Sequence, residues 1–340
     1  MAEDGNVQAG TSYAATSQKT MSQIAMTLAA LAYAPPAYLA GYFTSHDVVG
    51  QRFSLIWQPD PSADPVNFAF IVQNIATSGY MVAIRGTYPD PLSSAYWADG
   101  AQDNPFGTMQ PWPNAASSGA CVSAGTWAGL QSLLGLTGDG RSLQAVLQQL
   151  GDVDLCFTGH SLGGTLAPVL ALWDAERFAA KSLCVYAFAG MTPGNAAFAD
   201  LFAQSPVLAD RVWRYNNTLD TVPYGWDRVL DTRSFYTPAP KGGLVVEALL
   251  TGTALLLAPY GYAAVGVEIQ LPGKLLAIPI RCELVAYVIE NLHQHLPDTY
   301  LTLLGAPPIP LRIGFGPYVV SAPPQPSSEA VSRRVVYALT

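Results

Sequence analysis

Charged residues are scarce in this chain. They make up 12% of its 340 residues, against 50% hydrophobic residues, and the formal net charge is −8. No lysine or arginine cluster occurs beyond the pair Arg333-Arg334. A basic patch is the footprint of nucleic-acid binding, and basic clusters attract anionic lipid. The composition therefore argues against both partners and leaves a neutral or zwitterionic lipid interface open.

Cysteine is scarce as well. The four cysteines are Cys121, Cys156, Cys184 and Cys282, and no pair has the spacing of metal ligands. Cys156 and Cys184 lie in apolar, strand-like runs, which predicts small buried hydrophobic side chains. A disulfide between any two of the four stays open, and so does the compartment, cytoplasmic or secreted.

Long apolar runs are few, and neither of the two is typical of a leader or a membrane span. Ile24–Ala34 ends like a signal-peptidase site, but the residues before it are acidic and polar and include no basic region. We therefore expect a flexible tail over residues 1–18 and an amphipathic helix over Met21–Tyr33, with no obvious signal peptide. Leu244–Val267 contains a glutamate, glycines and a proline, so we expect no transmembrane segment. A buried helix, or one that opens towards lipid, is favoured there.

The most informative motif is Gly159-His160-Ser161-Leu162-Gly163-Gly164, which follows a strand-like run and precedes a buried helical pattern. This order predicts a sharp strand-to-helix turn that presents the Ser161 hydroxyl. Glycines are expected beside the serine because a side chain would collide with the neighbouring strand and helix. The alternative is a tight turn with an inert serine.

Strand-like and helical segments alternate along much of the chain, which predicts an α/β fold with a mostly parallel sheet and helices on both faces. We expect one domain over residues 19–340, with a helical and hairpin insertion around residues 238–282. The predicted strands are Arg52–Trp57, Asn67–Ile75, Tyr80–Arg85, Val153–Thr158, Leu183–Ala189 and Arg211–Asn216, and the hairpin pairs Val265–Leu271 with Leu275–Ile280. The predicted helices are Gly125–Leu134, Arg141–Leu150, the segment from Leu162 to about Phe178, Asn195–Ala203 and Glu283–Leu292.

A serine nucleophile needs a base, and the chain has four histidines. His160 is expected to pack or to form local hydrogen bonds, and His46 reads as a surface turn residue. A base late in the chain fits the order Ser…Asp…His. His295 is the choice over His293, because Pro297 indicates that the chain leaves its helix here.

Two further kinds of group complete the predicted site. Asp220 follows a strand and would orient the histidine, and Asp227 and Asp231 are alternatives for this role. If Asp220 has no functional role, its position before Pro223 predicts a turn or cap residue. Backbone N–H groups of Leu162, at the start of a helix, and of Thr87, after a strand, would stabilise an oxyanion.

A long segment after Thr87 lacks periodicity and is rich in proline and aromatic residues. Such a segment, around residues 88–120, could cover an apolar pocket and open at a lipid surface. A static loop with its aromatic side chains in the core is the alternative. The aromatic and sulfur residues concerned are Tyr88, Tyr96, Trp97, Phe106, Met109 and Trp112.

Together these segments resemble the class 3 lipase family of α/β hydrolases. The matching pieces are Ala83–Thr87, the Ser161 hexapeptide, Tyr215–Pro223 around Asp220, and His295 with Tyr300-Leu301. The resemblance implies an α/β-hydrolase fold and a carboxylester lipase. It implies Ser161 as nucleophile, His295 as base, Asp220 as orienting acid, Thr87 and Leu162 as the oxyanion hole, and a lid after Thr87.

The expected chemistry is hydrolysis of a lipid ester or other carboxylester through an acyl-enzyme, with no metal or organic cofactor. A triacylglycerol lipase is the main hypothesis. The alternatives are a short-chain esterase, a phospholipase or an acyltransferase on the same residues, or an inactive lipid-binding protein.

Overall fold

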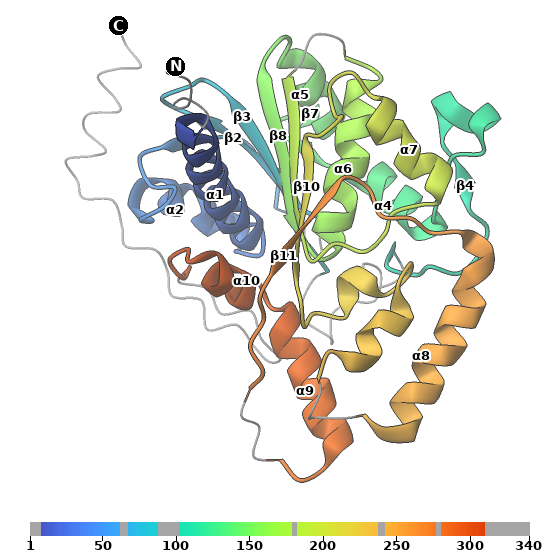
Figure 1. Ribbon diagram of the computed structural model, residues 1–340. Helices are drawn as coiled ribbons and strands as arrows, with labels where there is room; N and C mark the ends of the chain where they lie inside the picture. Colours follow the sequence, from blue (N-terminus) through green and yellow to red (C-terminus); the bar gives the residue numbers. More distant parts are fainter. Residues whose placement is uncertain are drawn as a thin grey trace, which may run out of the picture.

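The computed structural model describes residues 8–61, 67–87, 102–178, 182–236, 242–276 and 280–309. Seven strands form one sheet in the order β1-β2-β3-β8-β9-β10-β11 (Figure 1). β3, β8, β9, β10 and β11 are parallel, and β1 and β2 add antiparallel pairs at one edge. The strands are β1 Phe53–Trp57, β2 Ala69–Asn74, β3 Tyr80–Ile84, β8 Asp154–His160, β9 Ser182–Phe188, β10 Val212–Asn217 and β11 Val267–Leu271.

Helices cover both faces of the sheet, as the alternation predicted (Figure 1). Side chains alternate between the two faces along each strand. On β3, Met81 and Ala83 belong to one core with the first and last helices, and Val82 and Ile84 belong to the other core. The first core packs under α1 Gln8–Leu31, α2 Leu39–Ser45 and α10 Pro297–Leu304, and the second under α4 Ala124–Gly135, α5 Leu143–Gln149, α6 Leu162–Ala175 and α7 Ala196–Gln204.

The remaining elements lie around the carboxyl ends of the parallel strands or join the larger ones. Trp226, Val229, Leu257 and Tyr262 form a small third core beneath α8. The remaining elements are α8 Gly243–Leu257, α9 Glu283–His295, the turns of 3-10 helix η1 Pro36–Tyr38, η2 Pro113–Ser118, η3 Val222–Tyr224, η4 Val229–Ser234 and η5 Ala258–Tyr260, and the short strand pairs β4 Gln110–Pro111 with β5 Cys121–Val122 and β6 Thr137–Gly138 with β7 Arg141–Ser142.

The first helix begins earlier than expected. It starts at Gln8, so the prediction of a tail over residues 1–18 was wrong for residues 8–18. From Thr11 to Leu31 the chain contains no proline or glycine. Once the buried half of the helix has formed against the sheet, nothing in the sequence stops it from extending towards the N-terminus.

The predicted late hairpin is wrong as far as the described residues show. β11 pairs in parallel with β10, and residues 275, 276 and 280 of its predicted partner form no strand, while residues 277–279 lie outside the described residues. Instead, the N–H of Leu276 donates to the carboxylate of Glu290 on α9, 3.2 Å away. The alternating pattern of Val265–Leu271 indicated a strand correctly, but alternation alone does not name the strand's partner.

Cys156 and Cys184 are joined by a disulfide rather than being two separate buried side chains. They face each other in the register of β8 and β9, with Cα atoms 4.6 Å apart. Both are only partly buried. The prediction of small buried hydrophobic residues was therefore wrong, because adjacent parallel strands place the two positions within bonding reach.

Candidate active site

Ser161 occupies a strained turn between β8 and α6. Its φ is 59° and its ψ is −126°, a backbone region that costs free energy for a residue with a side chain. The glycines around it allow the close approach that this turn requires. A Cβ on Gly159 would lie 2.2 Å from the carbonyl oxygen of Gly163, and a Cβ on Gly163 would lie 2.2 Å from that of Ile84. The sterically required glycines of the motif are thus present for the reason predicted.

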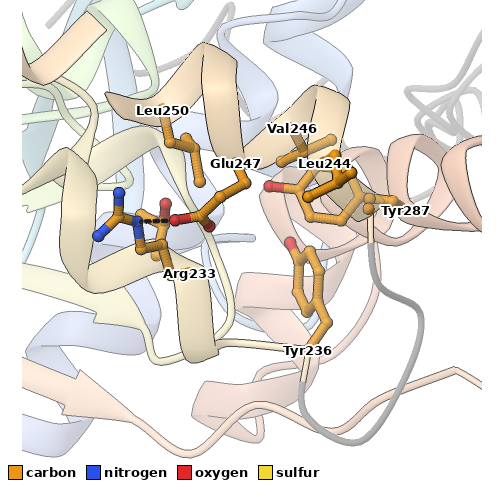
Figure 2. Close-up of a pocket in the computed structure, with 10 residues that line it drawn as sticks. Arg233, Tyr236, Leu244, Val246, Glu247, Leu250 and Tyr287 are labelled. Carbon is orange, nitrogen blue, oxygen red and sulfur yellow. Dashed lines mark ion pairs between the residues drawn. The ribbon is translucent and has the colours of Figure 1, made fainter. Parts of the chain in front are cut away.

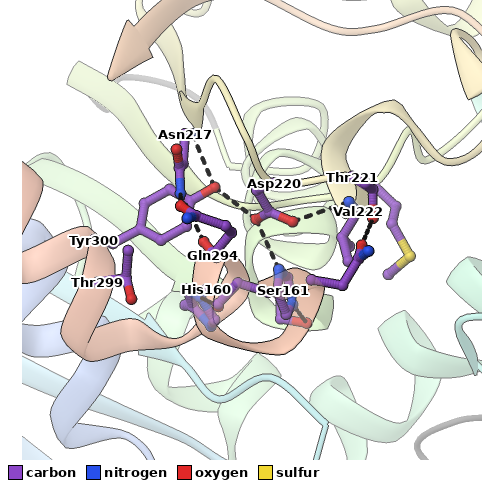
Figure 3. Close-up of polar contacts among 12 residues, drawn as sticks. His160, Ser161, Asn217, Asp220, Thr221, Val222, Gln294, Thr299 and Tyr300 are labelled. Carbon is purple, nitrogen blue, oxygen red and sulfur yellow. Dashed lines mark hydrogen bonds and ion pairs between the residues drawn. The ribbon is translucent and has the colours of Figure 1, made fainter. Parts of the chain in front are cut away.

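Ser161, His295 and Asp220 come together at the carboxyl edge of the sheet (Figure 3). The Oγ of Ser161 is 2.8 Å from Nε2 of His295, and Nδ1 of His295 is 2.8 Å from Oδ2 of Asp220. Ser161 lies 134 positions before His295 in the sequence, and Asp220 lies 75 positions before it. Only the tertiary fold therefore makes the three residues neighbours. This chain of hydrogen bonds connects a hydroxyl through an imidazole to a carboxylate.

Asp220 is fully buried just beyond the end of β10. Its Oδ1 accepts the N–H of Val222 at 3.0 Å, which forms a tight turn before Pro223. Its Oδ2 accepts the hydroxyl of Tyr300 at 2.8 Å in addition to the imidazole. The Tyr300 oxygen in turn accepts the N–H of Asn217 at 3.1 Å. Each of these bonds holds the carboxylate in the orientation that the imidazole requires.

His295 is the last residue of α9, which therefore extends past its predicted end at Leu292. The amide of Asn217 donates to the backbone carbonyl and the side-chain oxygen of Gln294, at 2.8 and 2.7 Å. These bonds attach the end of α9 to the end of β10, the strand that also carries Asp220. The base and its orienting acid are thus positioned by one local framework.

His160 is buried and its ring packs against Tyr33 and Tyr300, as one of the two expectations had it, but its hydrogen bonds join distant segments and are not local. Its Nε2 lies 2.8 Å from the backbone oxygen of His295, and its Nδ1 lies 3.0 Å from the hydroxyl of Tyr33. A carbonyl oxygen only accepts, so Nε2 carries the proton and Nδ1 accepts from Tyr33. Burial, and then the nearby His295, hold the pKa of His160 well below its usual value. His160 is therefore a neutral donor to the backbone of His295.

The pKa of His295 is raised above its ordinary value. Burial favours the neutral ring, but the Asp220 carboxylate and its hydrogen bond, with a smaller contribution from Asp103, outweigh that effect. Carboxylates favour the charged imidazolium because they are negative and close. A site with this electrostatic balance stabilises a proton on the imidazole when it is taken from the serine.

Thr87 follows β3, and Leu162 is the first residue of α6, directly after Ser161. The Thr87 hydroxyl donates to Oδ2 of Asp103 at 2.7 Å. Burial raises the pKa of Asp103 to about 6, against the opposing effects of Thr87 and His295. The first N–H groups of a helix have no partner within it, so the N–H of Leu162 is available to a ligand.

The alternative candidates do not join this constellation. His293 lies two residues before His295 on α9, about 200° around the helix axis. His46 follows α2, and its Nδ1 accepts the N–H of Val48 in a turn. Asp227 lies beside Arg228 at 3.8 Å, and Asp231 belongs to η4. Among the three candidate aspartates, the one that contacts the His295 imidazole is Asp220.

The segment predicted as a cover falls partly outside the described residues, because positions 88–101, with Tyr88, Tyr96 and Trp97, are not among them. Its described end is anchored. Trp112 is fully buried and donates its indole N–H to Glu176 at 2.8 Å. Met109 packs beside the third core, whereas Phe106 is exposed. Trp112 thus lies in the core, and Met109 is only partly buried against the third core.

Three residues of this site were not predicted as members. Tyr300 was part of the resemblance, but no pattern indicated its bond to Asp220. Tyr33 reads as the end of the first helix, and Asp103 lies in a segment without periodicity. All three reach the site through contacts between distant segments, for which a single sequence carries no local signal.

Comparison with known proteins places these observations in context. Residues 81–225 match the family model described as lipase (class 3). No curated protein sequence matched. Among solved structures, M37 lipase is 24% identical, with a TM-score of 0.67 over 85% of this chain and 92% of that one. Lipase II from Rhizopus niveus is 18% identical, with a TM-score of 0.53 over 76% and 82%.

A third similar structure is a triacylglycerol lipase described as having a serine-protease triad at its catalytic centre. It is 17% identical, with a TM-score of 0.53 over 76% of this chain and 82% of that one. At these identities the structural likeness shows the fold, a mostly parallel sheet flanked by helices as in the α/β hydrolases. The predicted resemblance is therefore confirmed: the chain has the α/β-hydrolase fold and resembles the class 3 lipase family, whose model it matches over residues 81–225.

Proposed function

We propose that this protein is a lipase that cleaves carboxylesters of lipids, with Ser161 as nucleophile, His295 as base and Asp220 as orienting acid. The observation that carries the proposal is the pair of 2.8 Å contacts that link the serine hydroxyl through the imidazole to the carboxylate. A serine hydroxyl becomes a useful nucleophile when a positioned base takes its proton. The match to the class 3 lipase model supports the choice of an ester as substrate.

In the first half of the reaction, the Oγ of Ser161 forms a bond to the ester carbonyl carbon while Nε2 of His295 takes the hydroxyl proton. The carbonyl oxygen becomes an oxyanion, and the N–H groups of Thr87 and Leu162 donate to it. The bond from carbon to the alcohol oxygen then breaks, and the leaving alcohol takes the proton back from His295. The product at this stage is an acyl group on Ser161.

In the second half, water gives a proton to His295 and attacks the acyl carbon. The bond between this carbon and Oγ of Ser161 breaks, the serine recovers its proton, and the acid is released. Asp220 keeps the imidazole in the tautomer that has its lone pair towards Ser161 and stabilises the transient imidazolium. The strained turn at Ser161 supports this role, because such a turn presents a serine hydroxyl to a substrate carbonyl.

We also infer that residues 19–340 form a single catalytic domain. Seven of the described strands in this range form one central sheet with a large core on each face, and the site uses side chains from Tyr33 to Tyr300. A single catalytic domain accounts for this, because the site is incomplete without either end of it. The segment after Thr87 remains the proposed cover of the acyl pocket.

The test is hydrolysis of p-nitrophenyl butyrate and palmitate by the wild type, Ser161→Ala and Ser45→Ala. Ser45 is an exposed serine on α2 and serves as the matched control. We expect Ser161→Ala to lose essentially all turnover on both esters and Ser45→Ala to retain it. A preference for palmitate supports a lipase, and cleavage of butyrate alone supports the short-chain esterase. Wild-type turnover in Ser161→Ala contradicts the assignment of the nucleophile.

A fluorophosphonate probe provides an independent check of the site. It should label the wild type at Ser161 with loss of fluoride and should not label Ser161→Ala. An intact, folded wild type that neither reacts with the probe nor cleaves either ester would support the inactive lipid-binding alternative instead.

A further inference from the structure

The surface of α8 that faces away from the molecule is entirely apolar. Leu244 is 87% exposed and Leu255 is 72% exposed, and only Val246 and Leu257 of the fifteen residues are buried. At about 100° per residue, the outward positions fall within an arc of roughly 140°. We call this surface the outer face of α8; it consists of Leu244, Val245, Ala248, Leu249, Gly252, Leu255 and Leu256.

The polar side chains of α8 lie outside this arc, with Glu247 and Thr251 on one flank and Thr253 on the other. Glu247 pairs with Nε of Arg233 at 2.9 Å, and the same guanidinium donates to Thr251 at 2.6 Å (Figure 2). These groups stand beside a pocket of about 440 Å³ between η4, α8 and α9, which Tyr236 and Tyr287 also line. The outer face therefore has no charged or hydrogen-bonding side chain, although it is the surface most exposed to solvent.

The neighbouring helix also exposes apolar side chains. α9 packs against α8, and Val246 and Tyr287 line the same pocket from the two helices. Leu284, Val285 and Val288 on α9 are each between 42% and 47% exposed. Exposed apolar side chains gathered on two adjacent helices differ from leucines scattered singly over a surface, and such a gathering indicates an interaction site.

The chemistry of the outer face favours lipid over protein as its partner. Protein interfaces are enriched in tyrosine, tryptophan, methionine and arginine at their centres, and the outer face contains none of these. By length and composition the segment Gly243–Tyr260 is apolar enough to cross a membrane. The face is uncharged and the chain carries a net charge of −8, so a neutral or zwitterionic lipid surface fits it and an anionic one is repelled.

The connections of α8 indicate that it would lie on a membrane rather than span one. Its fifteen residues measure about 22 Å, which is shorter than a hydrocarbon core of about 30 Å. η4 ends at Ser234 and α8 begins at Gly243, and η5 and a short link lead from the other end of α8 into β11 of the central sheet, so both ends return to the same domain. Figure 1 shows α8 along the edge of the molecule, away from the sheet.

We propose that the outer face of α8, with Leu284, Val285 and Val288 of α9, is a docking surface for neutral or zwitterionic lipid. This proposal rests on the proposed function, because the docking surface would bring a lipid-cleaving enzyme to its substrate. It lies outside both the family-matched residues and the predicted cover around residues 88–120. α9 ends at His295, so the docking surface and the base belong to one helix.

The test uses flotation with phosphatidylcholine vesicles in a Ser161→Ala background, where no ester is cleaved. We expect this protein to float with the vesicles and to be indifferent to salt. Leu249→Ser combined with Leu255→Ser should raise the lipid concentration for half-maximal binding about tenfold or more. Ile75→Ser is the matched control, because Ile75 is 59% exposed at the distant turn after β2 and should leave binding unchanged.

Three results would overturn the proposal. One is the absence of binding to phosphatidylcholine vesicles by the folded protein. Another is equal binding by the Leu249→Ser/Leu255→Ser variant, with thermal unfolding showing both proteins folded. The third is a dimer by light scattering that this variant converts to a monomer, which would assign the face to a second copy. Hydrolysis of p-nitrophenyl butyrate is measured separately, in the wild type and the leucine variant with Ser161 intact. Because vesicle binding and ester hydrolysis can each fail without the other, failure of the docking proposal is distinguished from failure of the proposed function.

Discussion

The imidazole of His160 donates its Nε2 hydrogen to the backbone oxygen of His295 across 2.8 Å. The residue beside the proposed nucleophile thereby holds the backbone of the proposed base. The Tyr33 hydroxyl fixes the other nitrogen of the same ring. Because the backbone of His295 is held from β8 and its side chain from Asp220, the imidazole has little freedom to leave Ser161.

His160→Leu should lower kcat by about tenfold to 100-fold and leave KM nearly unchanged. The substitution removes the donor to the His295 carbonyl, and a small displacement of a catalytic group carries a penalty of this size. Steady-state kinetics on p-nitrophenyl butyrate will measure it. His160→Gln offers a replacement N–H donor and should recover part of the loss, whereas equal kinetics in all three proteins would deny His160 a positioning role.

The acid limb of the pH profile of kcat/KM should have its midpoint above 6.5. The pKa of His295 is raised, and the base works only when neutral, so activity rises with pH through that pKa. Asp103→Asn removes a negative charge that favours the imidazolium, while an acceptor for Thr87 remains. The midpoint should therefore move to lower pH in Asp103→Asn, as measured by initial rates between pH 5 and about 9.

Asp139→Asn is the matched control for that shift. Asp139 is an exposed carboxylate in the turn between β6 and β7, and its positive φ suits asparagine. The pH profile of kcat/KM for Asp139→Asn should superimpose on that of the wild type. If the midpoint moves to higher pH in Asp103→Asn, or moves equally in both variants, the raised pKa of His295 does not depend on the nearby charge of Asp103.

Tyr300→Phe should reduce the free energy of unfolding by about 1–3 kcal/mol. The phenol is fully buried, accepts the N–H of Asn217 and donates to Asp220, so its loss leaves both groups short of a partner. Urea denaturation measures the change. Tyr38→Phe, at an exposed tyrosine, should be neutral. A neutral Tyr300→Phe would show that water replaces the lost hydroxyl without cost.

Removal of the disulfide by Cys156→Ala with Cys184→Ala should cost about 3–4 kcal/mol, the chain-entropy value for a separation of 28 residues. Cys282→Ala, at an exposed free cysteine, should change stability little. Denaturation with and without reductant measures both effects. If reductant leaves the wild-type midpoint unchanged while fully reducing the pair, the bond does not contribute to stability.

Much of the site was predictable because its requirements are local. Gly159 and Gly163 are needed wherever a strand turns this sharply into a helix, so the motif carries its geometry in its spacing. Asp220 could be proposed because it follows a strand, with Asp227 and Asp231 left open, and His295 could be preferred over His293 by chain order and by Pro297. The strands could be identified from alternation, since the pleat places every second side chain on the same face.

Other features depend on which segments meet. The hydrogen bonds of His160, Tyr300 and Asp103 join residues at least 16 positions apart, and no periodic pattern marks either partner. The partner of β11 and the Cys156–Cys184 bond follow from strand order, which the local sequence does not specify. The apolar run of α8 favoured a buried helix, but the structure leaves its outer face uncovered.

The sequence by itself determined the element types, the turn at Ser161 and the identities of the candidate catalytic groups. These depend on backbone sterics and on side-chain chemistry, both of which act within a few residues. Only the tertiary structure decided the exposure of α8, the neutral state of His160 and the raised pKa of Asp103. Burial and charge depend on what surrounds a group in space, and distant parts of the chain provide those surroundings.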